Sequence, residues 1–294
     1  MFQRMSRTIS LRHRFESALA RAAFALFGLL PTRAASAAGG WLGRAIGPLT
    51  RAHKTAQRNI ARAMPELDEA ARARILTEAW DNFGRTMFEY AVLDALGRDQ
   101  ARVLIEGHEQ LAQLAAEGRP AVLFCAHLGN WEIIPPPLAR LAKPLTIVYR
   151  PPNNPLVDRI IGEARVPWTA GMAPKGAAGA RQMMKALATG EHLILVVDQK
   201  INTGMEIPFF GRGAFTGDAV ARFAMRFNCP VFPVRTERLA DGRFKVTVEE
   251  PWTFPPDGNN DDVRAALTRI NQRLEDWIRA RPGQWLWMHK RWPD

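Results

Sequence analysis

The sequence predicts an α/β protein, with a mixed, partly parallel central sheet flanked by helices and a helical N-terminal extension. From Val103 onward, short apolar runs alternate with helical stretches. Such alternation is typical of a partly parallel sheet covered by helices. Before Val103 the pattern is helical throughout, and the chain has no internal repeat or low-complexity linker. We therefore divide it into an N-terminal segment, residues 1–63, and an α/β domain, residues 64–294.

Periodicity and turn residues give the elements in order. Residues 1–63 are predicted as mostly helical, with breaks near Pro31 and the Gly39-Gly40 pair, and residues 68–96 as one long helix. Strands are expected at 103–106, 121–126, 145–150, 192–198, 231–239 and 244–249, the last two forming a hairpin. Further helices are expected at 109–117, 131–142 (interrupted by three prolines), 155–164, 176–189, 218–228 and 261–280.

The positive charge is concentrated in residues 1–63, which hold eleven Arg or Lys and one acid, Glu16. The rest of the chain holds 29 basic and 28 acidic side chains. This distribution and the lack of a helix-turn-helix or zinc-finger pattern argue against a nucleic-acid partner. Cys125 and Cys229 lie in apolar runs, so we expect both to be buried and reduced, as in a cytoplasmic chain.

The N-terminal segment also carries apolar residues at helical spacing. These are Phe15, Leu19, Ala22, Ala23, Leu26, Leu29 and Leu30. The uncharged stretch 22–32 is shorter than the roughly 20 residues of a membrane span. We expect a membrane-anchoring interfacial helix whose apolar side lies in the lipid boundary. Its basic residues would then lie near anionic headgroups; they are Arg4, Arg7, Arg12, Arg14 and Arg33. An amphipathic helix packed on the domain fits the same pattern.

A histidine directly follows the strand 121–126, in the block His127-Leu128-Gly129-Asn130-Trp131-Glu132. Loops at the ends of strands are where α/β proteins place chemistry. A carboxylate across the Gly-Asn turn can orient the imidazole and stabilise its protonated form. We therefore predict His127 as a general base oriented by Glu132. A histidine that only packs or caps is the alternative.

Two other strands end in polar residues, Arg150 and the pair Asp198-Gln199. If these strands are parallel neighbours, His127, Arg150 and Asp198 converge at one edge of the sheet. A base, a cation and a carboxylate around a cleft suit acyl transfer. The stretch 208–216 is expected to be an apolar, glycine-rich loop that opens a helix.

These blocks together resemble the bacterial lipid A biosynthesis acyltransferases, the late acyltransferases of the lysophospholipid acyltransferase superfamily. The resemblance covers nearly the whole chain, from the basic apolar N-terminus to the terminal run 284–292, Gln-Trp-Leu-Trp-Met-His-Lys-Arg-Trp. Between them lie the His127 to Glu132 block, the Tyr149-Arg150-Pro151 block, Asp198-Gln199 and the 208–211 loop. One departure is Lys200, where enterobacterial-type members tend to have another acid.

The resemblance implies transfer of a fatty acyl group from acyl carrier protein to a glycolipid hydroxyl. The usual acceptor is the hydroxyl of an acyl chain on the Kdo-bearing lipid A precursor, at the cytoplasmic face of the inner membrane. His127 and Glu132 would be catalytic, and no metal or other cofactor would be required. The implied substrate contacts are Asn130, Arg150, Asp198, Gln199, Gly211 and Thr216. Arg150 would offset charge on the thioester oxygen or hold a phosphate.

Several alternatives remain open at this point. The acceptor could be a lysophospholipid, an ornithine lipid or a mannosylated glycolipid, with acyl-CoA as donor. The chain could instead be a non-catalytic peripheral membrane-binding protein, or a hydrolase in which His127 activates water. Trp285, Trp287 and Trp292 fit either an interfacial belt or core packing.

Overall fold

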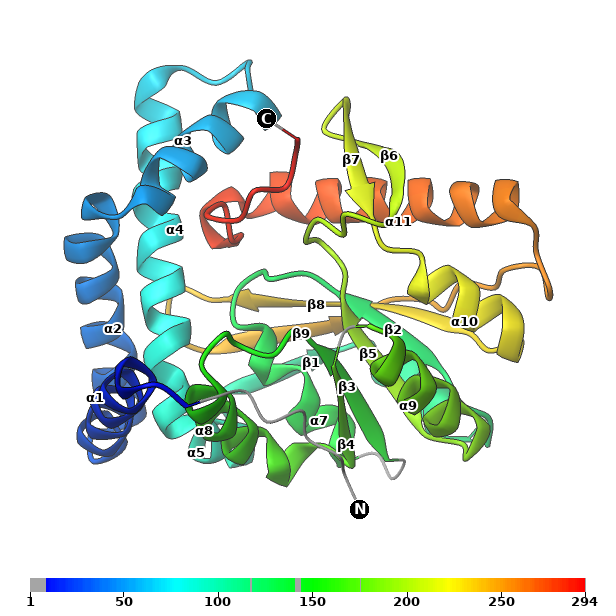
Figure 1. Cartoon of the computed structure of the whole chain (residues 1–294), viewed down its shortest axis with the longest axis horizontal. Helices are drawn as coiled ribbons and strands as arrows, with labels where there is room; N and C mark the ends of the chain where they lie inside the picture. Colours follow the sequence, from blue (N-terminus) through cyan, green and yellow to red (C-terminus); the bar gives the residue numbers. More distant parts are fainter. Residues whose placement is uncertain (1–8, 117, 141–143, 175, 294) are drawn as a thin grey trace.

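The computed structural model describes residues 9–116, 118–140, 144–174 and 176–293. Arg4, Arg7 and the helix ends expected at residues 117 and 142 lie outside this part. A central sheet has helices above and below it, and four N-terminal helices stand at one side (Figure 1). These four are α1 (Leu11–Gly28), α2 (Thr32–Ile46), α3 (Arg51–Ala63) and α4 (Glu69–Glu89).

The sheet has seven strands in the order β1-β9-β8-β2-β5-β3-β4. Their bounds are β1 (Val103–Glu106), β2 (Val122–Cys125), β3 (Leu145–Tyr149), β4 (Gly171–Pro174), β5 (His192–Val196), β8 (Val231–Arg238) and β9 (Phe244–Val248). Within this sheet β8 and β9 pair in antiparallel fashion, across the predicted hairpin, and the other neighbours are parallel. The mixed, partly parallel sheet of the sequence prediction is confirmed.

Both faces of the sheet are covered, because alternate residues of each strand point to opposite sides. Val122 and Phe124 of β2 belong to one core cluster, and Leu123 and Cys125 belong to another. The first cluster includes side chains of α9 (Ala177–Ala188), α10 (Ala219–Phe227) and α11 (Asn260–Ala280), and the second includes those of α5 (Leu93–Arg98), α6 (His108–Ala116) and α7 (Pro135–Ala139). The sheet is thus buried on both sides, and the polar side chains that can meet a ligand lie at the strand ends.

The N-terminal helices are joined closely to the domain. Gly39 and Gly43 of α2 face Gly84 of α4, and a Cβ on Gly39 would lie 2.6 Å from the Gly84 carbonyl oxygen. The sequence predicts a helix break at the Gly39-Gly40 pair, and this prediction is wrong. The pair lies inside α2 and lets the backbones of α2 and α4 approach each other closely. In addition, α3 contributes Ile60 to the main core. The boundary at residues 63 and 64 stays a prediction, and packing crosses it.

Three other expectations differ from the structure. The stretch predicted as a loop before α10 is an antiparallel hairpin of β6 (Met205–Phe209) and β7 (Arg212–Thr216). The prolines divide the helix predicted at 131–142 into η3 (Trp131–Ile133) and α7. The long helix predicted from residue 68 is interrupted after α4 by η2 (Tyr90–Val92) before α5.

The C-terminal tryptophans belong to the core, since Trp285, Trp287 and Trp292 are each less than 5% exposed.

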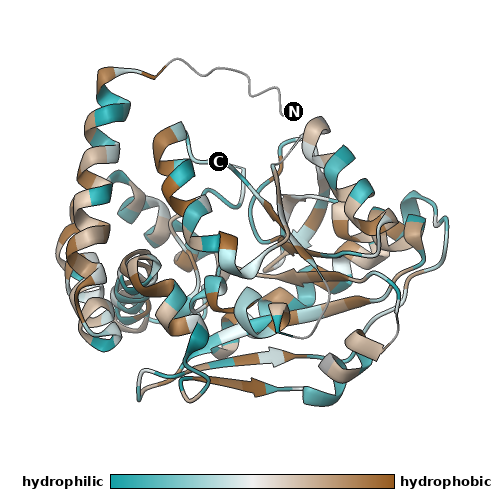
Figure 2. Cartoon of the chain, turned by 90° about the horizontal axis from the view of Figure 1, so that it is seen from below, coloured by the Kyte–Doolittle hydropathy of each residue, from teal (hydrophilic) through white to brown (hydrophobic). Residues whose placement is uncertain are grey.

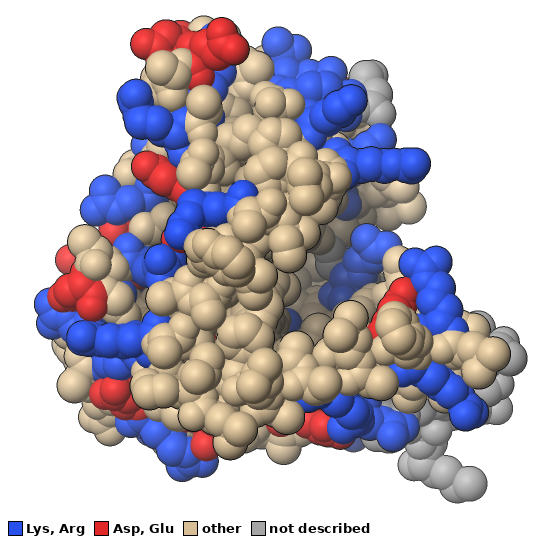
Figure 3. All heavy atoms as spheres, turned by 90° about the vertical axis from the view of Figure 1, so that its left-hand side faces the viewer, with Lys and Arg blue, Asp and Glu red and all other residues tan. Residues whose placement is uncertain are grey.

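The outer side of α1 and α2 carries large apolar side chains that are exposed. They include Leu11, Phe15, Leu19, Leu26, Leu29 and Trp41, each more than 60% exposed. Figure 2 shows hydrophobic and hydrophilic residues mixed along α1, at the edge of the molecule. The same side is a broad uncharged surface with Lys and Arg around it and a hollow beside it (Figure 3). Among the described residues, no helix is both long and apolar enough to cross a bilayer.

Candidate active site

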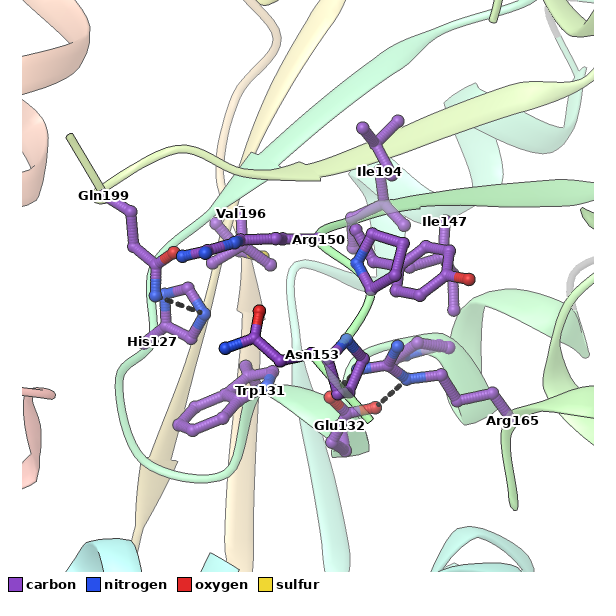
Figure 4. Close-up of a pocket in the computed structure, with 16 residues that line it drawn as sticks. His127, Trp131, Glu132, Ile147, Arg150, Asn153, Arg165, Ile194, Val196 and Gln199 are labelled. Carbon is purple, nitrogen blue, oxygen red and sulfur yellow. Dashed lines mark hydrogen bonds and ion pairs between the residues drawn. The ribbon is translucent and has the colours of Figure 1, made fainter. Parts of the chain in front are cut away.

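The carboxyl ends of β2, β5 and β3 lie side by side at one edge of the sheet. β5 pairs in parallel with both β2 and β3, so the residues that follow these strands are brought together. His127, Gln199 and Arg150 line one cavity of about 340 Å³ (Figure 4). Asp198 lies next to His127, with its Oδ1 2.7 Å from the imidazole Nδ1. The predicted convergence of the three strand ends is confirmed.

His127 is held by Asp198. The imidazole Nδ1 lies 2.7 Å from Asp198 Oδ1, and the His127 backbone N–H donates to Asp198 Oδ2 at 2.9 Å. Because an ionised carboxylate only accepts hydrogen bonds, Nδ1 carries the proton and Nε2 of the neutral ring is an acceptor. Gln199 Nε2 lies 3.4 Å from this Nε2, and the Trp131 ring packs edge-on against the imidazole. A histidine with a fixed tautomer therefore presents a basic nitrogen at the cavity.

Asp198 is set up to stay ionised although its side chain is only 2% exposed. Burial alone would raise the pKa of the Asp198 carboxyl. The charge of His127 and hydrogen bonds from His127 and Trp285 outweigh burial and hold that pKa well below its usual range. A permanent anion beside Nδ1 stabilises the imidazolium that forms when Nε2 takes a proton.

Glu132 does not orient the imidazole, and this corrects the sequence prediction. Its carboxylate accepts two hydrogen bonds from Arg165, at 2.8 and 2.6 Å, and one from the Tyr90 hydroxyl at 2.6 Å. The physical reason is burial: at 4% exposure, the charge of Glu132 needs a cation, and the planar guanidinium binds both oxygens at once. Glu132 and Arg165 still line the cavity, on the wall opposite Gln199 (Figure 4).

The Glu132–Arg165 pair is charged on both sides. Burial would raise the pKa of the Glu132 carboxyl, but the charge and hydrogen bonds of Arg165 and the Tyr90 hydroxyl hold it below its usual range. Burial would lower the pKa of Arg165, and Glu132 reverses this and raises it. The Tyr90 hydroxyl is kept neutral, because burial and the Glu132 charge raise its pKa strongly. This wall of the cavity is polar but carries no net charge.

Arg150 is the cation that the cavity leaves available. It lines the cavity above His127 (Figure 4). Within the described part of the chain, its guanidinium makes no hydrogen bond or ion pair, whereas Arg165 is bound to Glu132. Arg150 can therefore bind an incoming anion or an oxygen that gains charge.

Three expected substrate contacts do not line this cavity, and their role as contacts stays a prediction. Asn130 is 1% exposed; its amide donates to Glu89 at 2.7 Å and its oxygen accepts from the Glu132 backbone N–H at 3.0 Å. Gly211, with φ 68°, forms the exposed turn between β6 and β7. Thr216 is fully buried and bonded to Arg291 at 2.8 Å. Asn130 and Thr216 therefore serve the fold through their hydrogen bonds.

The loop after His127 is fixed from two directions. The Gly129 carbonyl accepts from Asn82 at 2.9 Å and Thr86 at 3.1 Å, both on α4. Gly129 has φ 58°, and a Cβ there would lie 2.5 Å from the Thr236 carbonyl oxygen, so only glycine fits. On the other side, the Gly129 N–H donates to the Gln284 carbonyl. His127 is thus mounted on a rigid turn.

Several residues of the site escaped the sequence analysis. Arg165 lies at the C-terminal end of α8 (Pro155–Arg165) and Tyr90 follows α4, so no local spacing connects either with Glu132. The end of its strand identifies Asp198 in the sequence, but the sequence resemblance gives it the role of a substrate contact. Only the topology β2-β5, which makes two distant strands neighbours, reveals it as the partner of His127. Among the described residues, no group of three or more His, Cys, Asp or Glu is placed to hold a metal ion.

Comparison with known proteins agrees with the sequence resemblance. The profile of the family described as bacterial lipid A biosynthesis acyltransferase matches residues 4–294. A lipid A biosynthesis lauroyltransferase of Escherichia coli is 24% identical over 85% of this chain and 83% of its own. A lipid A biosynthesis acyltransferase of Haemophilus influenzae is 23% identical over 90% of this chain and 83% of its own. Among solved structures, the 1-acyl-sn-glycerophosphate acyltransferase PlsC of Thermotoga maritima covers 81% of this chain and 98% of its own, at 16% identity and a TM-score of 0.38. The chain belongs to the bacterial lipid A biosynthesis acyltransferase family and is an acyltransferase.

Proposed function

We propose that this enzyme transfers a fatty acyl chain from the thioester of acyl carrier protein to a hydroxyl of a lipid A precursor. The observation that carries the proposal is the His127–Asp198 pair, with Nδ1 bonded to a buried carboxylate and Nε2 at the cavity. This is the geometry of a general base. It replaces the expected His127–Glu132 pair as the catalytic arrangement.

The reaction needs one base and no covalent enzyme intermediate. His127 Nε2 takes the proton of the acceptor hydroxyl, and the hydroxyl oxygen forms a bond to the thioester carbonyl carbon. The carbon–sulfur bond then breaks, and the departing thiolate takes the proton from the imidazolium. The products are an ester and a free thiol.

The thiol of Cys125 is poorly suited to act as a nucleophile. Cys125 lines the cavity but is 1% exposed. Burial and the charges of Asp198 and Glu132 raise the pKa of its thiol well above the usual value. Because the thiolate is the reactive form, this favours direct transfer to the lipid hydroxyl over an acyl-cysteine.

The proposed acceptor is supported by the names of the relatives and by the charge of the site. Relatives are named for lipid A biosynthesis, and the names lauroyltransferase and palmitoleoyltransferase show that different relatives transfer different chains. Arg150 suits the thioester oxygen as it gains charge, or a phosphate of the acceptor. Gln199 lies beside Nε2, where the acceptor hydroxyl must bind.

The enzyme is proposed to work at the cytoplasmic face of the inner membrane. The exposed apolar side chains of α1 and α2 would enter the lipid boundary, with Arg12, Arg14 and Arg33 exposed near the headgroups. The cavity would then open close to the bilayer that holds the acceptor.

The experiment is mass spectrometry of the glycolipid after incubation with purified protein. Acyl carrier protein loaded with lauroyl, myristoyl or palmitoyl chains is the donor, and the Kdo-bearing lipid A precursor is the acceptor. We expect a mass gain of one acyl chain. His127→Ala should lower the rate on the order of 10²–10⁴-fold, the usual contribution of a general base.

Two controls separate the possible failures. Acyl-CoA replaces the acyl carrier protein in one arm, and lysophospholipid, ornithine lipid and mannosylated glycolipid replace the acceptor in others. No mass gain with the lipid A precursor and any donor would overturn the proposed acceptor. Near-wild-type turnover by His127→Ala would remove His127 from the mechanism.

A further inference from the structure

The C-terminal segment 284–287 is built into the catalytic loop. Leu128 and Trp285 form an antiparallel bridge. The Leu286 N–H donates to the His127 carbonyl at 3.1 Å, and the Gly129 N–H donates to the Gln284 carbonyl at 3.0 Å. This backbone pairing brings the Trp285 side chain to the carboxylate that holds His127.

Trp285 completes the hydrogen bonding of Asp198. Its indole Nε1–H donates to Asp198 Oδ2 at 2.7 Å. The same oxygen accepts from the His127 backbone N–H, and Oδ1 faces His127 Nδ1. The carboxylate therefore has one donor from a third segment, and that donor fixes its rotation about the side-chain bond.

The indole itself cannot turn away. Trp285 is 2% exposed, and its ring packs edge-on against Trp287 at 4.5 Å and against Phe209 at 5.9 Å between centroids. A donor locked by packing orients its acceptor more firmly than a flexible side chain would.

We propose that Trp285 is a positioning residue for acyl transfer: its indole N–H holds Asp198 in the orientation that fixes the tautomer and direction of the His127 ring. This rests on the proposed function. Trp285 does not touch the substrate. It acts only through Asp198, so its loss should affect the chemical step and leave substrate binding unchanged.

The first test compares Trp285→Phe with Trp277→Phe. Both changes remove a buried indole N–H that donates to a carboxylate, but the Trp277 N–H donates to Glu249 at 2.8 Å and not to Asp198. Loss of one hydrogen bond to a charged group predicts a fall in kcat on the order of tenfold for Trp285→Phe, with KM unchanged. Trp277→Phe should keep kcat within about twofold. Equal kcat losses in the two variants would overturn the proposal.

Two further measurements separate positioning from loss of fold. Replacement of Trp285 by 3-benzothienylalanine keeps the ring size and removes only the N–H, so it should reproduce the kcat loss with an unchanged melting temperature. In an Asp198→Asn background, Trp285→Phe should cause no further loss, because residues that act through one another are not additive. Full additivity, or full activity of the benzothienyl variant, would contradict the proposal.

The last measurement does not depend on the substrate. The proton on His127 Nδ1 gives a downfield resonance in NMR spectra, assigned by its absence in His127→Ala. We expect it to move or broaden in Trp285→Phe and to stay in place in Trp277→Phe. An unchanged resonance in Trp285→Phe would overturn the positioning role even if no acceptor were acylated. A changed resonance without any acyl transfer would leave the positioning role standing and count against the proposed reaction.

Discussion

At the scale of single residues, burial decides which carboxylate serves which partner. Glu132 and Asp198 are both almost fully buried, and each needs charged or donating groups around it. Arg165 can bind both oxygens of a carboxylate, and it binds those of Glu132. His127 is hydrogen-bonded to Asp198, which lies at a strand end 71 residues later in the chain. The site therefore contains two separate pairs, the Glu132–Arg165 ion pair and the hydrogen-bonded His127–Asp198 pair.

Asp198→Asn should lower kcat on the order of 10²–10⁴-fold, because an amide can hold the imidazole in the wrong tautomer and cannot stabilise its positive form. Acyl transfer by the purified variant is measured beside His127→Ala. The double variant should be no slower than His127→Ala alone, since the pair acts as one unit. A loss of less than tenfold in Asp198→Asn would show that the carboxylate is not part of the catalytic arrangement.

Glu132→Gln should destabilise the fold by about 3–5 kcal/mol, the cost of leaving a buried partner uncompensated. Its effect should depend on pH. The pKa of Glu132 is lower in the folded state, where burial is outweighed by Arg165, so the unfolded chain binds more protons in acid. The stabilisation is complete above the unfolded pKa of roughly 4.3 and is lost as pH falls through the folded value. Urea unfolding from pH 6 down to pH 3 tests this. The stability gap between wild type and variant should shrink toward acid, and a constant gap would contradict the assignment.

At the scale of elements, α2 and α1 connect the apolar outer surface with the loops of the candidate site. Ser36 of α2 donates to Glu89 at 2.6 Å, and Glu89 in turn binds Asn130 and Arg238. On α1, the His13 carbonyl accepts from Asn154, which caps α8 and follows the Arg150 loop. Both helices therefore present lipid-compatible side chains outward and hold parts of the site inward.

Gly43→Ala should destabilise the protein by about 1–3 kcal/mol, the usual cost of overpacking. The added Cβ would collide with the Trp80 carbonyl of α4, and backbone cannot move aside cheaply. Gly162→Ala, inside α8, is the matched control, because its Cβ meets only the flexible end of Met172 at 3.1 Å. Thermal unfolding of the two variants measures the difference. Equal melting temperatures would argue against close α2–α4 packing.

Removal of residues 1–30 should release the protein from anionic phospholipid vesicles, because it removes the exposed apolar side of α1. The domain should still unfold cooperatively. The double variant Phe15→Ser, Leu19→Ser keeps α1 and its bond to Asn154 but loses two side chains that are 72% and 63% exposed. It should bind vesicles more weakly with unchanged stability. Sedimentation with vesicles is the measurement, and a truncated chain that still sediments would place the anchor elsewhere.

At the scale of the whole molecule, the sequence predicted what depends on local pattern. The apolar runs located β2, β3 and β5, and the residues after them identified His127, Arg150 and Asp198. Contacts between residues far apart in the sequence could not be predicted from local pattern. The His127–Glu132 spacing favoured a local pair, but burial required Arg165 for Glu132. The sequence did not predict β6 and β7, because Gly211 and Gly213 obscure the strand pattern. It also did not predict that the Gly39-Gly40 pair, which usually ends a helix, would lie inside α2 and allow close packing against α4.

The bridge between Leu128 and Trp285 has a consequence for how the enzyme is made. A ribosome synthesises His127 and Asp198 long before it reaches the segment that orders them. Asp198 has its third donor only after residue 285 has emerged from the exit tunnel. A message truncated shortly before that codon would yield a chain that holds His127 and Asp198 but lacks the indole donor to Asp198. The proposed positioning of His127 would thus be complete only with the final stretch of translation.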